Sequence, residues 1–98
     1  MNLPNVYARV AVIGAGTMGI GIAQVAAGAG HPVWLFDIDA AAARQALDAL
    51  GQRLRQRVES GKADADATEA LLGRIQPVES LDQLADSALV IEAVSYTH

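Results

Sequence analysis

Apolar residues along the chain gather in short uninterrupted runs that alternate with longer segments of mixed character. The runs Val10–Ile13, Val33–Phe36 and Leu89–Val94 are built from aliphatic and aromatic residues with a single charge among them. Continuous runs of this kind predict strands of a parallel sheet that is covered on both faces. Ile75–Val78 predicts a fourth strand, at an edge of the sheet because its Pro77 has no N–H to donate to a neighbour.

The segments between these runs have the spacing of helices. In Thr17–Ala29 apolar residues recur at steps of four, three and four, which predicts a helix with one apolar stripe. Its members are Met18, Ile22, Val25 and Ala29. Gly30 suits a left-handed cap after this helix. Ala40–Glu59 predicts a long helix with a second, buried stripe, formed by Leu47, Leu50, Leu54 and Val58. Thr68–Arg74 predicts a short helix that follows a turn at residues 60–66. Ser80, with Gln83 three residues on, predicts a capping box.

The predicted order of elements is β-α-β-α-α-β-α-β. Alternation of apolar strands with helices is typical of an α/β fold with a parallel sheet and right-handed crossovers. The prediction is a Rossmann-type doubly wound parallel sheet, truncated to four strands in the order 3-2-1-4, with a helical insertion after the second strand.

Composition narrows the functional classes. The chain has 98 residues, 52% of them hydrophobic, a net charge of −4 and no cysteine. It therefore has no disulfide or thiolate site, and its acidity argues against nucleic acid as a partner. No apolar run approaches the roughly 20 residues that span a bilayer, and the N-terminus lacks the pattern of a signal peptide. These features predict a cytoplasmic protein that does not bind membranes.

The segment Val12-Ile13-Gly14-Ala15-Gly16-Thr17-Met18-Gly19 carries a G-x-G-x-x-G pattern between a predicted strand and a predicted helix. In this context Gly14 permits a tight turn, Gly16 leaves room for phosphates, and Gly19 allows close packing of helix on strand. The N–H groups of Thr17 and Met18, at the helix start, lack intrahelical partners and suit an anion. The pattern predicts a pyrophosphate site, although a purely structural turn remains the alternative.

Two acidic residues extend this prediction. Asp37 ends the second predicted strand, where its carboxylate can accept hydrogen bonds from ribose hydroxyls and would repel a 2′-phosphate, which favours NAD over NADP. Glu92 lies near the carboxyl end of the last strand, where open α/β sheets bind ligands. The alternative for Glu92 is that it caps nearby backbone or faces water.

Other polar residues carry weaker signals. Arg53, Arg55, Arg57 and Lys62 are compatible with substrate phosphates, but a solvated helix face is the favoured interpretation, with Arg55 and Glu59 spaced for a surface pair. His31 lies in a turn and is not predicted to be catalytic. Asp64 and Asp66 lack the other ligands of a calcium loop, so no metal site is predicted.

The chain resembles the NAD-binding (N-terminal) domain of the bacterial 3-hydroxyacyl-CoA dehydrogenase family. The resemblance runs from VIGAGTMGIGIA (Val12–Ala23) through Leu35-Phe36-Asp37, Gly61-Lys62 and Gly73-Arg74-Ile75 to LVIEAV (Leu89–Val94). It implies NAD as the cofactor, held by Asp37 at the ribose and by Glu92 near the nicotinamide. The pyrophosphate loop would consist of Gly14, Ala15, Gly16, Thr17, Met18 and Gly19.

The resemblance also implies what the whole enzyme does. It implies oxidation of the 3-hydroxyl of an acyl-CoA to a ketone in fatty-acid degradation, by a homo-oligomer. The family's catalytic histidine and glutamate follow the VIEAV strand, so no catalytic residue is assigned here, and residues 1–98 are expected to be a domain fragment. Ser95–His98 depart from the family and are expected to be a non-native tail. The alternatives are another NAD(P)-dependent 2-hydroxyacid or sugar-phosphate dehydrogenase, and a non-catalytic, crystallin-like NAD-binding protein.

Overall fold

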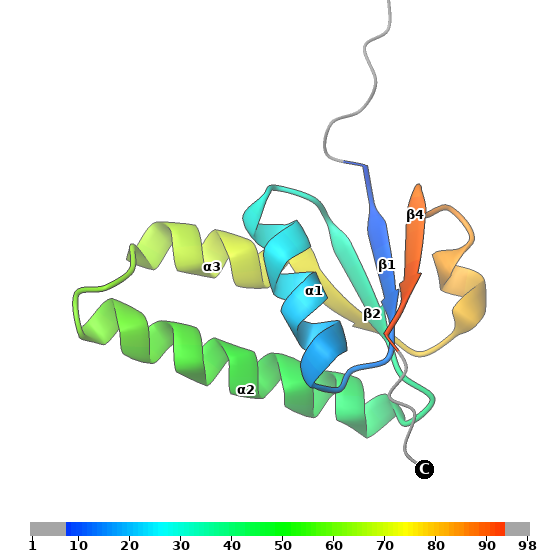
Figure 1. Cartoon of the computed structure of the whole chain (residues 1–98), viewed down its shortest axis with the longest axis horizontal. Helices are drawn as coiled ribbons and strands as arrows, with labels where there is room; N and C mark the ends of the chain where they lie inside the picture. Colours follow the sequence, from blue (N-terminus) through cyan, green and yellow to red (C-terminus); the bar gives the residue numbers. More distant parts are fainter. Residues whose placement is uncertain (1–7, 94–98) are drawn as a thin grey trace, which may run out of the picture.

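The computed structural model describes residues 8–93, which form a parallel sheet with helices packed against it (Figure 1). The strands are β1 (Val10–Ile13), β2 (Val33–Phe36), β3 (Ile75–Val78) and β4 (Leu89–Glu92). Their order in the sheet is β3-β2-β1-β4, which confirms the predicted topology. The last strand was predicted to reach Val94, but β4 ends at Glu92. Val94 and the predicted tail Ser95–His98 lie outside the described residues.

In residues 8–93, three α-helices and one 3₁₀ helix connect the strands. They are α1 (Thr17–Gly28), α2 (Ala40–Glu59), α3 (Ala65–Arg74) and η1 (Leu81–Leu84). Helices α2 and α3 form the predicted insertion and extend side by side beyond the sheet (Figure 1). Within residues 8–93, no helix is long and apolar enough to cross a bilayer.

The strands bury residues on both faces, which explains why their sequences are continuously apolar. One face packs against the three α-helices and includes Val12, Val33 and Leu35, all fully buried. On the other face, Ala11 and Val78 pack with Leu84 of η1. At the open end of the sheet β4 is less covered, and Leu89 and Val90 remain 54% and 47% exposed.

The predicted apolar stripe of α1 faces the core only in part, through Ile22. Met18 and Val25 are 64% and 74% exposed, whereas Gly19, Ile20, Ala23 and Ala27 are buried. Both sets have helical spacing, because α1 is apolar around almost its whole circumference. Gly19 and the alanines have small side chains, so the helix axis comes closer to the sheet on their side, and that side is the one buried.

Side-chain caps set where the other helices begin. Asp64 accepts a hydrogen bond from the N–H of Ala67 at 2.8 Å, so α3 starts at Ala65 and takes in residues predicted to be a turn. The capping box at Ser80 is confirmed, since Gln83 Oε1 accepts from the Ser80 N–H at 3.2 Å. In α2, the predicted stripe is confirmed at Leu50, which is fully buried.

Helices α2 and α3 are joined by an ion pair between Arg55 and Glu69. The guanidinium of Arg55 donates two hydrogen bonds of 2.9 Å to the Glu69 carboxylate. The predicted partner of Arg55 was Glu59, one turn along α2, but the α2–α3 hairpin presents the carboxylate of Glu69 in a geometry that engages both of its oxygens. The hydrogen bonds from Arg55 lower the pKa of Glu69 and raise that of Arg55.

Replacing Arg55 with glutamine is expected to return the pKa of Glu69 to its ordinary range. A carboxyl whose pKa is lowered by folding contributes stability above its unfolded pKa, and this contribution is lost as the pH falls through the folded pKa. The effect on stability should be small because both side chains are 57% exposed. NMR titration of the Glu69 side chain measures the shift. An unchanged pKa in R55Q would contradict the assignment.

Candidate cofactor site

The turn between β1 and α1 requires glycine at its first position. Gly14 has a φ of 105°, in the region that side chains disfavour. A Cβ there would lie 2.5 Å from the carbonyl oxygen of Ala93. The N–H of Gly14 donates to the carbonyl of Phe36 at 2.7 Å, so the turn leaves β1 still attached to β2.

Gly19 is required by the packing of α1 against this turn. A Cβ at Gly19 would lie 1.6 Å from the carbonyl oxygen of Gly14, a separation that non-bonded atoms do not reach. The first turn of α1 therefore lies directly on the backbone of the glycine turn, as the sequence predicts. No substitution at Gly19 fits without moving the helix away from the strand.

Gly16 differs from both, because nothing in residues 8–93 requires it to be glycine. Its φ and ψ of −72° and −169° are open to any residue, and no atom of the described residues beyond its chain neighbours lies within 4 Å of where its Cβ would stand. Open space beside an exposed N-cap position is what a bulky ligand passing over the turn would need. The prediction that Gly16 leaves room for phosphates fits this geometry.

The N-terminus of α1 is the one α-helix start in residues 8–93 that no side chain caps. Asp39 caps α2 and Asp64 caps α3, each accepting a hydrogen bond from a backbone N–H, while α1 starts from Gly16 without a side-chain cap or an acidic residue in its first turn. Thr17 and Met18 are exposed there. The positive end of the helix dipole is thus left open to an external anion.

Asp37 connects β2 to the glycine turn. Its Oδ2 accepts a 2.8 Å hydrogen bond from the N–H of Ala15, and its Oδ1 accepts a 2.9 Å bond from the N–H of Asp39. Each carboxylate oxygen keeps capacity for a further hydrogen bond, such as one from a ribose hydroxyl. The sequence places Asp37 at this edge but does not reveal its contact with Ala15, which joins the predicted ribose-binding and phosphate-binding residues.

Glu92 lies at the same edge of the sheet, on the other side of β1. It pairs in register with Ile13, the last residue before the glycine turn, and its side chain is exposed. The two acidic residues therefore flank the turn, Asp37 beyond β2 and Glu92 at the end of β4. This edge, where the chain order reverses between β1 and β4, is where open parallel sheets bind ligands.

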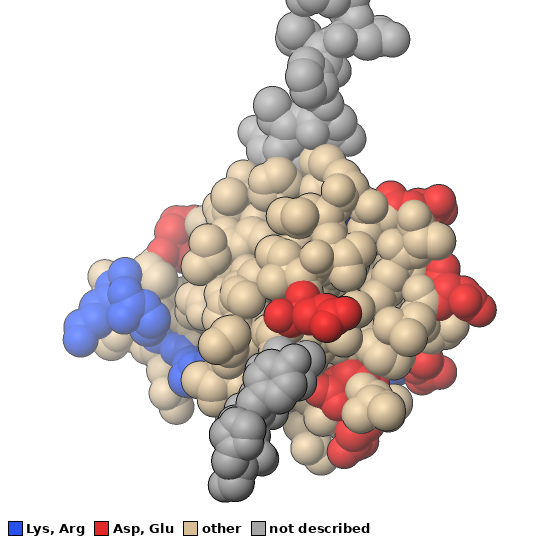
Figure 2. All heavy atoms as spheres, turned by 45° about the vertical axis from the view of Figure 1, so that its right-hand side comes forward, with Lys and Arg blue, Asp and Glu red and all other residues tan. Residues whose placement is uncertain are grey.

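An apolar groove of about 580 Å³ begins at Thr17 and Met18 and runs between α1 and β4. Ile22 and Val25 of α1 line it from one side, Leu89 and Ile91 of β4 from the other. Figure 2 shows a face that is mostly uncharged in this view, with acidic side chains near its centre, in its lower part and at its right margin, and basic ones at its left. The exposed stripe of α1 is thus a wall of this groove.

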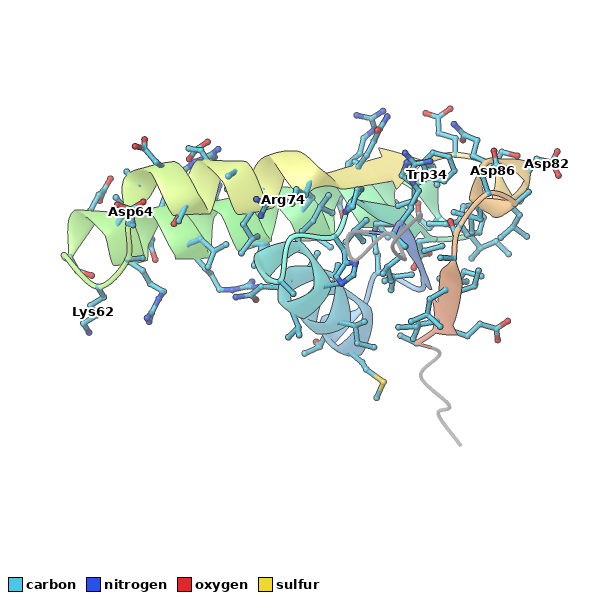
Figure 3. All side chains as sticks on the ribbon, turned by 90° about the horizontal axis from the view of Figure 1, so that it is seen from above. Trp34, Lys62, Asp64, Arg74, Asp82 and Asp86 are labelled. Atoms are coloured by element: carbon cyan, nitrogen blue, oxygen red, sulfur yellow. The ribbon has the colours of Figure 1, made fainter. Side chains whose placement is uncertain are left out.

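The remaining candidates do not join the site. Lys62 and Asp64 lie at the far tip of the α2–α3 hairpin, away from the sheet (Figure 3). The Nδ1 of His31 lies 2.8 Å from the carbonyl of Ala8, at the opposite end of β1 from the glycine turn. Among the residues described, no three His, Cys, Asp or Glu side chains are grouped to hold a metal ion.

Comparison with known proteins identifies the family. A model of the 3-hydroxyacyl-CoA dehydrogenase NAD-binding domain matches residues 9–97. The chain belongs to this family of NAD-binding domains. The family model describes an NAD-binding domain, so the cofactor is NAD.

Individual relatives agree with this assignment. The chain is 52% identical over 86 residues to a 3-hydroxyadipyl-CoA dehydrogenase of Escherichia coli K12, covering 88% of this chain and 18% of that protein. It is 42% identical over 87 residues to a 3-hydroxybutyryl-CoA dehydrogenase of Bradyrhizobium diazoefficiens, covering 89% and 30%. The crystal structure of a 3-hydroxybutyryl-CoA dehydrogenase from E. coli K12 superposes with a TM-score of 0.87 at 49% identity, covering 93% of this chain and 19% of that one.

The chain thus spans less than a third of the length of these relatives. The family match favours the NAD-binding domain of the 3-hydroxyacyl-CoA dehydrogenases over that of a 2-hydroxyacid or sugar-phosphate dehydrogenase. The contact of Ala93 with Gly14 and Gly19 is a further one that the sequence did not predict. The only signal for it in the sequence is a small residue directly after Glu92.

Replacing Asp37 with serine is expected to weaken NADH binding by about 10- to 100-fold, because a hydrogen bond to a charged group contributes about 1.5–3 kcal/mol. Binding of NADPH should change less, because the carboxylate that repels a 2′-phosphate is removed. Fluorescence titration with both nucleotides measures the two affinities. Asp39→Ala is the control: it removes the α2 cap and about 1 kcal/mol of stability, and should leave the NADH affinity unchanged. Equal losses for both nucleotides in D37S would contradict a contact with the ribose hydroxyls.

Proposed function

We propose that this chain is the cofactor-binding part of a longer NAD-dependent 3-hydroxyacyl-CoA dehydrogenase. The observation that carries the proposal is the open anion site at the start of α1, with Asp37 hydrogen-bonded to the same turn. A dinucleotide has a pyrophosphate for the one and a ribose for the other. The family membership supports NAD as the dinucleotide.

In this proposal each predicted residue has a separate task. The backbone N–H groups at Thr17 and Met18 hold the pyrophosphate, and Gly14, Ala15, Gly16 and Gly19 shape the turn beneath it. Asp37 orients the adenosine ribose. Glu92 lies on the nicotinamide side of β1, where its carboxylate can orient that end of the cofactor.

NAD bound here would supply the hydride acceptor for C3 of the substrate, and loss of the hydroxyl proton to a general base would complete the oxidation to a 3-ketoacyl-CoA. The task of residues 8–93 is to hold and orient the cofactor. We assign no catalytic residue to this chain, and place the general base in the part of the protein that the relatives have in addition. In the longer protein the substrate is an acyl-CoA, as the names of the relatives indicate for those proteins. We also propose that the longer protein is a cytoplasmic homo-oligomer.

The proposal is tested by titrating ¹⁵N-labelled chain with NAD⁺ and measuring the amide shifts. Shifts that saturate and centre on residues 14–19 and 37 are expected. In a separate assay at 340 nm, the chain should show no turnover of 3-hydroxybutyryl-CoA. Absence of shifts at millimolar NAD⁺ would refute cofactor binding, and turnover at the rate of a full-length relative would refute the division of tasks.

A further inference from the structure

Ala93 lies between the two glycines that shape the cofactor turn. It directly follows β4, is 7% exposed, and donates its N–H to the carbonyl of Ile13 at 2.8 Å. Its carbonyl oxygen would lie 2.5 Å from a Cβ at Gly14, and its methyl group 3.5 Å from a Cβ at Gly19. The end of β4 is therefore in contact with both ends of the glycine turn.

These contacts leave the turn little freedom to move. Gly19 cannot approach Gly14 more closely, since the backbone of α1 already lies against the Gly14 carbonyl. A side chain larger than alanine at position 93 would occupy the space next to Gly19. The start of α1 would then have to move away from the sheet, because the Gly14 carbonyl blocks any movement of Gly19 toward the turn.

We propose that Ala93 is a positioning residue that sets the location of the phosphate-binding N–H groups. The inference rests on the proposed function, and adds that the volume of the side chain at position 93 controls affinity for the pyrophosphate. Asp37 holds the turn through Ala15 from β2, and Ala93 supports it from β4. Because Ala93 is the neighbour of Glu92, the same support fixes the spacing between the turn and the carboxylate on the nicotinamide side.

The test compares two ligands, NAD⁺ and adenosine, in NMR titrations of the 98-residue chain. Adenosine has the ribose but no phosphates. Its affinity therefore measures binding at Asp37 and does not depend on the N–H groups at the start of α1. Ala93→Val is expected to weaken NAD⁺ binding by about 10-fold or more, because displaced N–H groups at the start of α1 lose hydrogen bonds to the charged pyrophosphate. Its affinity for adenosine should stay within about twofold. Ala93→Ser, with one added atom, should displace α1 less and weaken NAD⁺ binding by about threefold.

The control variant is Ala27→Val, which enlarges a fully buried alanine at the other end of α1. It is expected to lower the melting temperature but leave the affinity for NAD⁺ within about twofold. Equal NAD⁺ affinity in wild type and in A93V would overturn the inference, as would equal losses for NAD⁺ and adenosine. If A93V does not fold, A93S decides by the same two criteria. If the wild-type chain does not bind NAD⁺, the proposed function fails first, and the inference fails with it.

Discussion

Replacing Gly19 with alanine is expected to lower the free energy of unfolding by about 3 kcal/mol or more, the upper range for overpacking a buried site. The added methyl group would lie 1.6 Å from the carbonyl oxygen of Gly14. That oxygen belongs to the backbone of a turn fixed by Phe36 and Ala93, so neither partner can give way by rotating a side chain. Chemical denaturation measures the loss.

The matched control is Gly21→Ala, two residues further along α1. Apart from the backbone of α1 itself, no atom of residues 8–93 lies within 4 Å of its Cβ position, so the substitution adds helix propensity without a clash. It is expected to stabilise the chain by up to about 1 kcal/mol. Replacing glycine with alanine in α1 is thus expected to lower the free energy of unfolding at position 19 and to raise it at position 21. If G19A were as stable as G21A, the close contact between α1 and the turn would be wrong.

The strands and their order could be predicted from the sequence because the two central strands are buried on both faces. Val10–Ile13 and Val33–Phe36 are continuous apolar runs for that reason, and Pro77 correctly indicated an edge strand. The crossover rule then leaves few topologies. The buried side of α1 could not be predicted this way. Met18 and Val25 are as apolar as Ile20, and only the packing of α1 against the rest of the fold buries Ile20 and leaves the other two exposed.

Tertiary hydrogen bonds account for the other differences. The pairing of Arg55 with Glu69 depends on how α2 and α3 are placed against each other, and local spacing pointed to Glu59 instead. The contact of Asp37 with Ala15 likewise joins residues that are far apart in the chain. Sequence spacing identified the candidate residues of the site, and the sheet determines that Asp37 and Glu92 flank one turn.

Replacing Gly16 with aspartate is expected to separate stability from cofactor binding. The backbone of Gly16 is extended and its Cβ position is empty, so the side chain fits. As an N-cap and a negative charge at a helix start, aspartate should stabilise α1 by about 0.3–1 kcal/mol. The same carboxylate would occupy the N–H groups proposed for the pyrophosphate and repel it. NAD⁺ affinity should fall by at least about 100-fold, a loss of about 2.7 kcal/mol, while adenosine binding through Asp37 persists.

Gly16→Ala serves as the uncharged comparison, since its methyl group alone should cost less affinity than the carboxylate. Calorimetry gives the melting temperatures, and NMR titration gives the affinities for NAD⁺ and adenosine. A chain that loses both stability and binding in G16D would show that the fold itself needs glycine at this position. Unchanged NAD⁺ affinity would place the phosphates elsewhere, because a ligand at the start of α1 has to pass this residue. A more stable chain that no longer binds NAD⁺ would mean that the open N-terminus of α1 is kept at the expense of stability, as strained or incompletely satisfied groups at binding sites are.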